Sequence, residues 1–170
     1  MKLETLRCRN CMLKIIGIDP GLAATGVGIV KGQGSKIAEY AYSSISTPSK
    51  SALPTRLNQI FTELENLLKK EQPDLMVVED IFSLAKYPKS GITLGKVTGV
   101  ILLAGYRCNT PVVEIPVREA KQVLTGSGNA GKKQFEMTVR NLLNLQTQIK
   151  PYHASDALGL AIIGLFRAKF

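Results

Sequence analysis

Four side chains with the chemistry to bind divalent cations stand out in the sequence: Asp19, Glu79, His153 and Asp156. Carboxylate oxygens and imidazole nitrogens are common protein ligands of such ions. Two ions held about 3.5–4 Å apart can activate a water molecule and stabilise the leaving oxygen of a phosphodiester. The set therefore indicates metal-dependent phosphodiester hydrolysis, provided that the fold brings the four residues together.

Each of these residues also has an ordinary structural explanation. An Asp before Pro-Gly, as at Asp19, often forms a turn, and Glu79 follows an apolar run where a strand end would be solvated. Asp156 near a helix start would compensate the helix dipole, and a lone histidine is more often structural than catalytic. His153 and Asp156 are three residues apart, a spacing that places both on one face of a helix.

The charge of the chain points to a polyanionic partner. Its 170 residues contain 22 Lys and Arg against 13 Asp and Glu, a formal net charge of +9. Such an excess attracts nucleic acid or an anionic membrane surface. A basic protein with an acidic pocket suits a nuclease, because cations hold the polyanion while carboxylates hold the metal.

The length suits a single compact domain, which we expect over residues 13–170 after an irregular N-terminal extension, residues 1–12. No apolar run reaches the roughly 18 residues of a membrane span, and the first residues lack the features of a signal peptide. We therefore expect a cytoplasmic protein without a membrane partner. Cys8 and Cys11 form one CxxC pair, but a closed zinc site needs a second pair of ligands.

The apolar pattern predicts alternating strands and helices. Short β-branched runs predict five strands, at residues 13–19, 27–31, 37–45, 75–78 and 112–115. Apolar residues at helical spacing predict five helices, at residues 54–70, 91–106, 117–124, 132–143 and 154–169. We expect Gly26 to break the chain between the first two strands and residues 32–34 to form a hairpin loop. This order indicates an α/β layered domain.

Two predicted elements bear directly on function. The fully apolar run 75–78 is typical of a central parallel strand. If it pairs with residues 13–19, Asp19 and Glu79 share the carboxyl-end edge of the sheet, where sites form in open α/β folds. The unusually apolar helix 91–106 is expected to be buried on more than one side, by the core or by a partner chain, and is the candidate dimer interface.

Four segments, in this order, resemble the successive motifs of the RuvC family of Holliday junction resolvases. They are residues 16–21 (IGIDPG) with Thr25-Gly26, residues 78–82 (VEDIF), residues 120–123 (AKQV) leading to 126–128 (GSG), and residues 153–158 (HASDAL). The match spans residues 12–166. The resemblance implies a ribonuclease H-like fold, with a mixed five-stranded sheet flanked by helices.

The resemblance also implies an activity, a cofactor and partners. It implies symmetric incision of four-way DNA junctions by a homodimer, with two Mg²⁺ ions per active site, Mn²⁺ being an alternative, and cooperation with a branch-migration motor. It places the metal-binding role on Asp19, Glu79, His153 and Asp156. The family's junction-proximal aromatic falls on Phe82, and its functional lysines fall on Lys121 and Lys132.

One position departs from the family pattern, because many members have Asp where this chain has His153. A nitrogen ligand suits Mn²⁺ better than Mg²⁺, which prefers oxygen. Alternatively, His153 exchanges a proton near neutral pH; both interpretations stay open. Asp80 should point to the opposite face from Glu79 if the strand continues, so it is not included among the metal ligands.

Basic residues follow the acidic motifs along the chain and extend the DNA-binding hypothesis. They are Lys86, Lys89, Arg118, Lys121, Lys132 and Lys133. Together they could neutralise backbone phosphates, although any one of them could equally be solvated surface. Phe82 could stack on bases at an opened junction or pack in the core.

Two other function classes compete with a nuclease. Residues 126–132 fit GxxxxGK, the start of a nucleotide-binding loop. The next residue, Lys133, lacks the hydroxyl that would bind Mg²⁺, and the segment follows a predicted helix where a strand is required, so nucleotide hydrolysis is disfavoured. The other alternative is a ribonuclease H-like module that grips branched DNA without cutting it, because His153 leaves the metal site short of a carboxylate.

Overall fold

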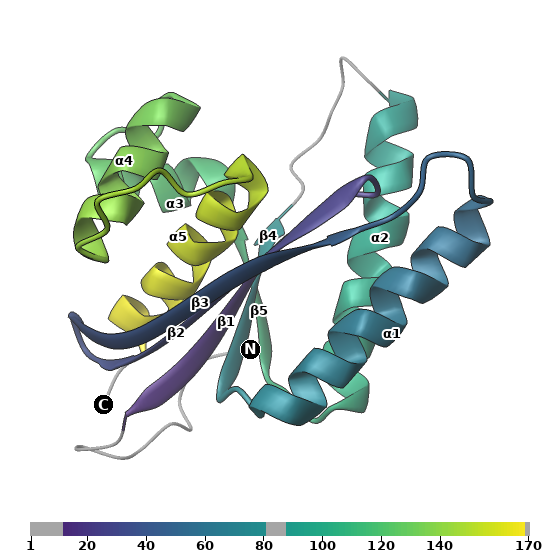
Figure 1. Cartoon of the computed structure of the whole chain (residues 1–170), viewed down its shortest axis with the longest axis horizontal. Coiled ribbons are helices and arrows are strands. Elements are labelled where there is room, and N and C mark those ends of the chain that lie inside the picture. Colours follow the sequence, from purple (N-terminus) through teal and green to yellow (C-terminus); the bar gives the residue numbers. More distant parts are fainter. Residues whose placement is uncertain (1–11, 81–87, 169–170) are drawn as a thin grey trace.

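The computed structural model describes residues 12–80 and 88–168. Its centre is a mixed five-stranded sheet with strand order β3-β2-β1-β4-β5 (Figure 1). The strands are β1 (Leu13–Asp19), β2 (Ala24–Gln33), β3 (Lys36–Ser46), β4 (Leu75–Asp80) and β5 (Val112–Pro116). β1 is antiparallel to β2 and parallel to β4, which is parallel to β5. The α/β architecture and the five strands predicted from the sequence are confirmed.

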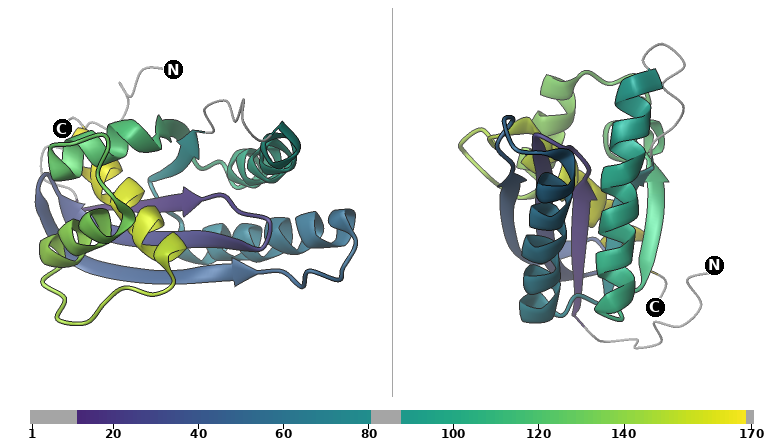
Figure 2. Two further views of the ribbon diagram at one scale, coloured as in Figure 1. Left: turned by 90° about the horizontal axis from the view of Figure 1, so that it is seen from above. Right: turned by 90° about the vertical axis from the view of Figure 1, so that its right-hand side faces the viewer.

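Five helices cover the two faces of the sheet (Figure 2). They are α1 (Leu53–Glu71), α2 (Pro88–Arg107), α3 (Val117–Thr125), α4 (Lys132–Leu142) and α5 (Tyr152–Arg167). α1 and α2 pack on one face and α3, α4 and α5 on the other, so neighbouring β1 residues serve different cores. Ile15 lies in the cluster with α5, whereas Ile16 lies in the cluster with α1 and α2.

α5 is the central helix of its layer, because it lies directly on β1 and β2. Every residue from Ala157 to Leu165 is buried, as expected for a helix that is apolar on all sides. The close approach depends on Gly17, where a Cβ would overlap the backbone carbonyl oxygen of Ala157. The sheet therefore fixes the position of α5 along this buried stretch.

Two sequence-based expectations for the β-hairpin are wrong. β2 runs without interruption from Ala24 to Gln33, so Gly26 does not break the chain. Gly26 pairs with Asp19 of β1 on one side and with Ser44 of β3 on the other. The hairpin turn lies at Gly34 and Ser35, because the ladder extends through positions 32 and 33.

Helix α2 was expected to be buried on more than one side, by the core or by a partner chain, and the core covers only one side. Val97, Ile101 and Ala104 are fully buried in the cluster shared with α1. On the other side of the helix, Leu103 is 51% exposed and Tyr106 is 80% exposed. The core thus covers a single stripe of α2, and the remaining apolar side chains face outward.

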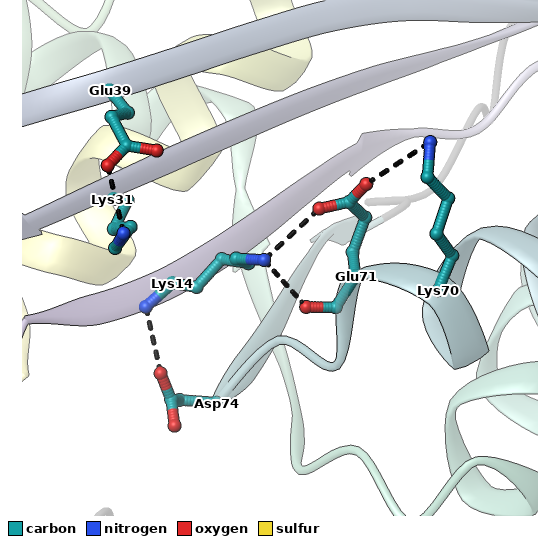
Figure 3. Close-up of polar contacts among 6 residues, drawn as sticks. All are labelled: Lys14, Lys31, Glu39, Lys70, Glu71 and Asp74. Atoms are coloured by element: carbon teal, nitrogen blue, oxygen red, sulfur yellow. Dashed lines mark hydrogen bonds and ion pairs between the residues drawn. The ribbon is translucent and has the colours of Figure 1, made fainter.

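Ion pairs fasten the end of the sheet remote from Asp19 (Figure 3). Lys14 in β1 contacts the Glu71 carboxylate at 3.1 Å and donates to the Glu71 carbonyl oxygen, while its backbone N–H donates to Asp74 at 2.8 Å. These contacts tie the start of β1 to the α1–β4 connection.

Within the described parts of the chain, no helix is long and apolar enough to cross a membrane.

Candidate active site

The carboxyl ends of β1 and β4 bring two acidic residues together. The parallel register pairs Ile18 with Val78, so Asp19 and Glu79, the next residue of each strand, lie side by side. Both side chains point to the α5 face, because they share the face of Gly17 and Val77, which contact α5. The predicted meeting of the two residues at one sheet edge is confirmed.

The first turn of α5 supplies the other two residues. His153 and Asp156 are on this turn, and the Nδ1 atom of His153 lies 2.6 Å from Oδ2 of Asp19. Asp19 is buried, whereas the His153 side chain is 45% exposed. The hydrogen bond to Asp19 raises the pKa of His153, although partial burial opposes this effect. His153 therefore has one side on Asp19 and the other open to solvent.

The carboxyl groups of the site carry more negative charge than their surroundings stabilise. Burial raises the pKa of Glu79 to about 8, aided by a hydrogen bond to Asp19 and by the charges of Asp19 and Asp156. Burial and the charge of Asp19 also raise the pKa of Asp156 to about 6. At neutral pH the Glu79 carboxyl group is therefore mainly protonated, and the site holds a proton where a cation would be favourable.

The chemistry of this donor set suits a divalent cation, since three carboxyl groups and one imidazole converge from three elements. The raised pKa values of Glu79 and Asp156 support the same conclusion, because a cation would offset the repulsion that produces them. Among the residues that the structure describes, however, no three His, Cys, Asp or Glu side chains are already spaced to hold one ion. Binding would require Asp19 to exchange its hydrogen bonds for metal coordination.

Two predicted basic residues act on the site. The positive charge of Lys121 lowers the pKa of Glu79 and Asp156, and that of Lys132 lowers the pKa of Asp156 and His153. Lys121 is on α3 and Lys132 begins α4. The two lysines thus lie near the carboxyl groups and come from α3 and α4, which supply none of the four predicted metal ligands.

The other predicted DNA contacts are not brought to the carboxyl groups in this way. The Arg118 side chain lies against Gly128, and Lys133 is exposed next to Lys132. Phe82 and Lys86 lie outside the described residues, as does the side chain of Lys89. Their roles stay predictions.

A glutamine that the sequence did not single out organises the loop between α3 and α4. The side-chain amide of Gln122 donates to the Gly126 carbonyl oxygen at 2.8 Å, and its oxygen accepts from the Gly128 N–H at 2.9 Å. The loop therefore has a defined shape where it leads into Lys132. It follows a helix, as predicted, so the context required for a nucleotide-binding loop is missing.

Gly26 is the second residue whose role was missed. A Cβ at this position would overlap the carbonyl oxygen of His153, so only glycine lets α5 begin this close to β2. The Thr25-Gly26 pair was visible in the sequence as part of a motif, but the helix that contacts it is about 130 residues away along the chain.

Comparisons with known proteins agree with this geometry. A family model described as crossover junction endodeoxyribonuclease RuvC matches residues 15–164. A protein of that name from Brevibacillus brevis is 41% identical over 150 residues, which are 88% of this chain and 90% of the relative. One from Syntrophomonas wolfei is 39% identical over 153 residues, 90% of this chain and 88% of the relative. The solved structure of T. thermophilus RuvC in complex with Holliday junction substrate has a TM-score of 0.84 at 27% identity, covering 92% of this chain and 94% of that chain.

Proposed function

Because the chain belongs to the RuvC family of crossover junction endodeoxyribonucleases, we propose that Asp19, Glu79, His153 and Asp156 form its active site. The chain is a nuclease that resolves Holliday junctions by hydrolysing DNA phosphodiester bonds, and nucleases of this family depend on divalent metal ions. The observation that carries the assignment is the meeting of β1, β4 and α5 at one sheet edge, where Asp19 lies beside Glu79 and is hydrogen-bonded to His153.

The four residues are proposed to hold Mg²⁺, with Mn²⁺ as the alternative, and two ions per site. When bound, the metal supplies activation of a water molecule and stabilisation of the leaving oxygen. Glu79 must release its proton, and Asp19 must turn its oxygens from Glu79 and His153 toward the metal. Lys121 and Lys132, whose charges already act on the carboxyl groups, would contact the phosphates of the DNA strand.

The finer assignment of partners is also part of the proposal. The junction is proposed to be cut by a homodimer that joins through the exposed face of α2, where Ile92 is 62%, Leu103 51% and Tyr106 80% exposed. This apolar face supports an interface because the core leaves it uncovered. Cooperation with a branch-migration motor and a cytoplasmic location stay predictions from the sequence and the family resemblance.

A junction cleavage assay tests the proposal directly. The protein is incubated with a labelled four-way junction, or with a linear duplex of the same sequence, in Mg²⁺, Mn²⁺ or EDTA. Paired nicks on opposed strands are expected for the junction in the presence of metal and not for the linear duplex or in EDTA. Tight junction binding without cleavage in any divalent ion would instead support a binding module.

The affinity of the DNA-free protein for Mg²⁺ should rise with pH between about 6 and 8. The metal competes with the proton on Glu79, whose pKa is about 8, so the dissociation constant should fall roughly tenfold per pH unit in this range and level off above it. Calorimetry at pH 7 in two buffers of different ionisation enthalpy should show release of at least about one proton per site, from Glu79 and in part from His153, whose pKa is also raised and whose imidazole must be neutral to bind metal. A proton count of zero, or an affinity independent of pH, would contradict the raised pKa.

The substitution His153→Asp should change the metal preference. Replacing nitrogen by carboxylate oxygen favours Mg²⁺, so the ratio of the cleavage rate in Mg²⁺ to that in Mn²⁺ should increase about tenfold. His153→Asn is the matched control, because it removes the imidazole without adding a negative charge. If the ratio is unchanged in His153→Asp, His153 is not a metal ligand and proton transfer is the better interpretation.

A further inference from the structure

A fully buried carboxylate outside the site binds the segment that leads into α5. Glu136 on α4 is 2% exposed, and its Oε1 accepts a hydrogen bond of 2.9 Å from the backbone N–H of Ile149. The same oxygen lies 3.5 Å from Nε of Arg140, one turn further along the helix. Nε makes no hydrogen bond, so the charge of Glu136 is its compensation. Arg140 in turn donates through Nη1 to the carbonyl oxygen of Gln146 at 3.4 Å.

These contacts hold the connection between α4 and α5 at two points, Gln146 and Ile149. Ile149 is itself fully buried and precedes His153 by four residues, with Pro151 as the residue that caps the start of α5. The connection passes along the side of the α3–α5 layer before α5 begins (Figure 2). Its placement, together with the contact of His153 with Gly26 of β2, therefore determines where the first turn of α5 lies.

Hydrophobic packing alone would have been a simpler way to fasten this connection. A buried ion pair is often no more stabilising than apolar side chains of the same volume, because both charges lose their hydration. The carboxylate differs from apolar packing because a hydrogen bond is directional. It accepts a hydrogen bond from one particular N–H, that of Ile149, and so fixes the backbone at this residue. α4 also starts with Lys132, whose charge acts on Asp156 and His153, so one helix holds both a basic residue of the site and the approach to its acidic half.

We propose that Glu136 is a positioning residue for cleavage: through the Ile149 N–H it fixes the start of α5 and thereby places His153 and Asp156 against Asp19. Asp19 and Glu79 are positioned by the strands and do not depend on it. The inference rests on the proposed function, because it takes His153 and Asp156 to be part of the active site.

Three variants separate positioning from stability. Glu136→Gln keeps an oxygen that can accept from Ile149, and we expect its kcat to stay within about threefold of wild type. Glu136→Met removes the acceptor and leaves the buried Nε of Arg140 without a counter-charge, so both Tm and kcat should fall. Glu136→Met combined with Arg140→Met removes both charges; its Tm should recover, whereas its kcat should stay about 10- to 100-fold below wild type because α5 remains displaced.

Two readouts show whether the effect passes through Ile149. Hydrogen exchange at the Ile149 amide should be slow in wild type and in Glu136→Gln, and at least tenfold faster in both variants that carry Met at position 136. The dissociation constant for the junction, measured in Ca²⁺, should stay within about twofold, because the loss is in positioning and not in DNA binding. Leu64→Ala is the control for stability: Leu64 is a residue of α1 that is buried on the opposite face of the sheet, so its Tm should fall without a change in kcat at temperatures where the protein is folded.

The proposal is overturned if the double Met variant cleaves at the wild-type rate, or if Leu64→Ala loses as much kcat as Glu136→Met at equal Tm. Failure of the proposed site has a different signature. His153→Ala and Asp156→Asn would then both cleave as wild type, whereas inactive His153 and Asp156 variants together with a fully active double Met variant would reject only the role of Glu136.

Discussion

Substitution of Glu79 by Gln is expected to lower the rate of junction cleavage at least about 1000-fold, equivalent to a loss of roughly 4 kcal/mol of transition-state stabilisation. The side chain keeps its size but can no longer ionise, so it cannot coordinate a metal through a carboxylate. The charges of Asp19, Asp156 and Lys121 all act on the Glu79 carboxyl group. A single-turnover cleavage assay with a labelled junction in Mg²⁺ measures the effect.

The adjacent residue provides a matched control. β4 continues through Asp80, so Asp80 points to the face of α1 and α2, away from Glu79. Asp80→Asn removes the same charge one position further along the strand, and its cleavage rate should stay within about threefold of wild type. Equal losses in the two variants would show that net charge, and not the placement of Glu79, determines the rate.

The substitution Glu79→Gln should also stabilise the metal-free protein at alkaline pH. When folding raises the pKa of a carboxyl group, the protonated group is tolerated in the native state and the ionised group destabilises it. This destabilisation develops as the pH rises from the pKa of the group in the unfolded protein to its pKa in the folded protein. For Glu79 these values are 4.5 and about 8. At pH 8.5 in EDTA, Glu79→Gln should therefore increase the free energy of unfolding by as much as about 4 kcal/mol, with little difference at pH 4.5. Urea unfolding at both pH values tests the sign.

Local sequence pattern predicted the elements well where one apolar period ran without interruption. Residues 13–19 and α1 were found close to their observed ends, because strand and helix periods are properties of the local chain. The errors fall at glycines. Gly26 was predicted to break the chain and Gly32 to belong to the hairpin loop, but both lie inside a continuous strand, because their missing side chains make room for a neighbouring segment. Which segment approaches a glycine is a tertiary property that local pattern cannot supply.

The acidic half of the site was predictable for a similar reason. The carboxyl ends of two parallel strands meet at one edge, so Asp19 and Glu79 follow from the strand assignment. The contact of His153 with Asp19 spans 134 positions, and motif resemblance, not spacing, indicated it. Glu136 was not predicted, since a glutamate in an amphipathic helix normally reads as solvated surface and only the packing of the α4–α5 connection buries it.

The positions of His153 and Asp156 both depend on the position of α5. A substitution at Gly26, which contacts the start of α5, would perturb that position directly. An alanine in the middle of a strand is normally more favourable than a glycine, because glycine loses more backbone entropy on folding. Here the added Cβ would overlap the carbonyl oxygen of His153 and contact its Cβ at 3.1 Å. The substitution Gly26→Ala therefore tests the contact through the sign of its effect.

Gly26→Ala should lower the free energy of unfolding by about 3 kcal/mol, because a backbone carbonyl cannot move aside as a flexible side chain would. In the folded fraction, the first turn of α5 must shift away from β2, and a displacement of this kind should reduce the cleavage rate about 100-fold. Urea unfolding and single-turnover cleavage at low temperature measure the two effects separately. Gly131→Ala before α4, where a Cβ meets nothing within 4 Å, is the control for stability and should change the free energy of unfolding by no more than about 1 kcal/mol. A folded Gly26→Ala protein that cleaves at the wild-type rate would show that α5 can move without loss of function, and His153 would then have no place in the active site.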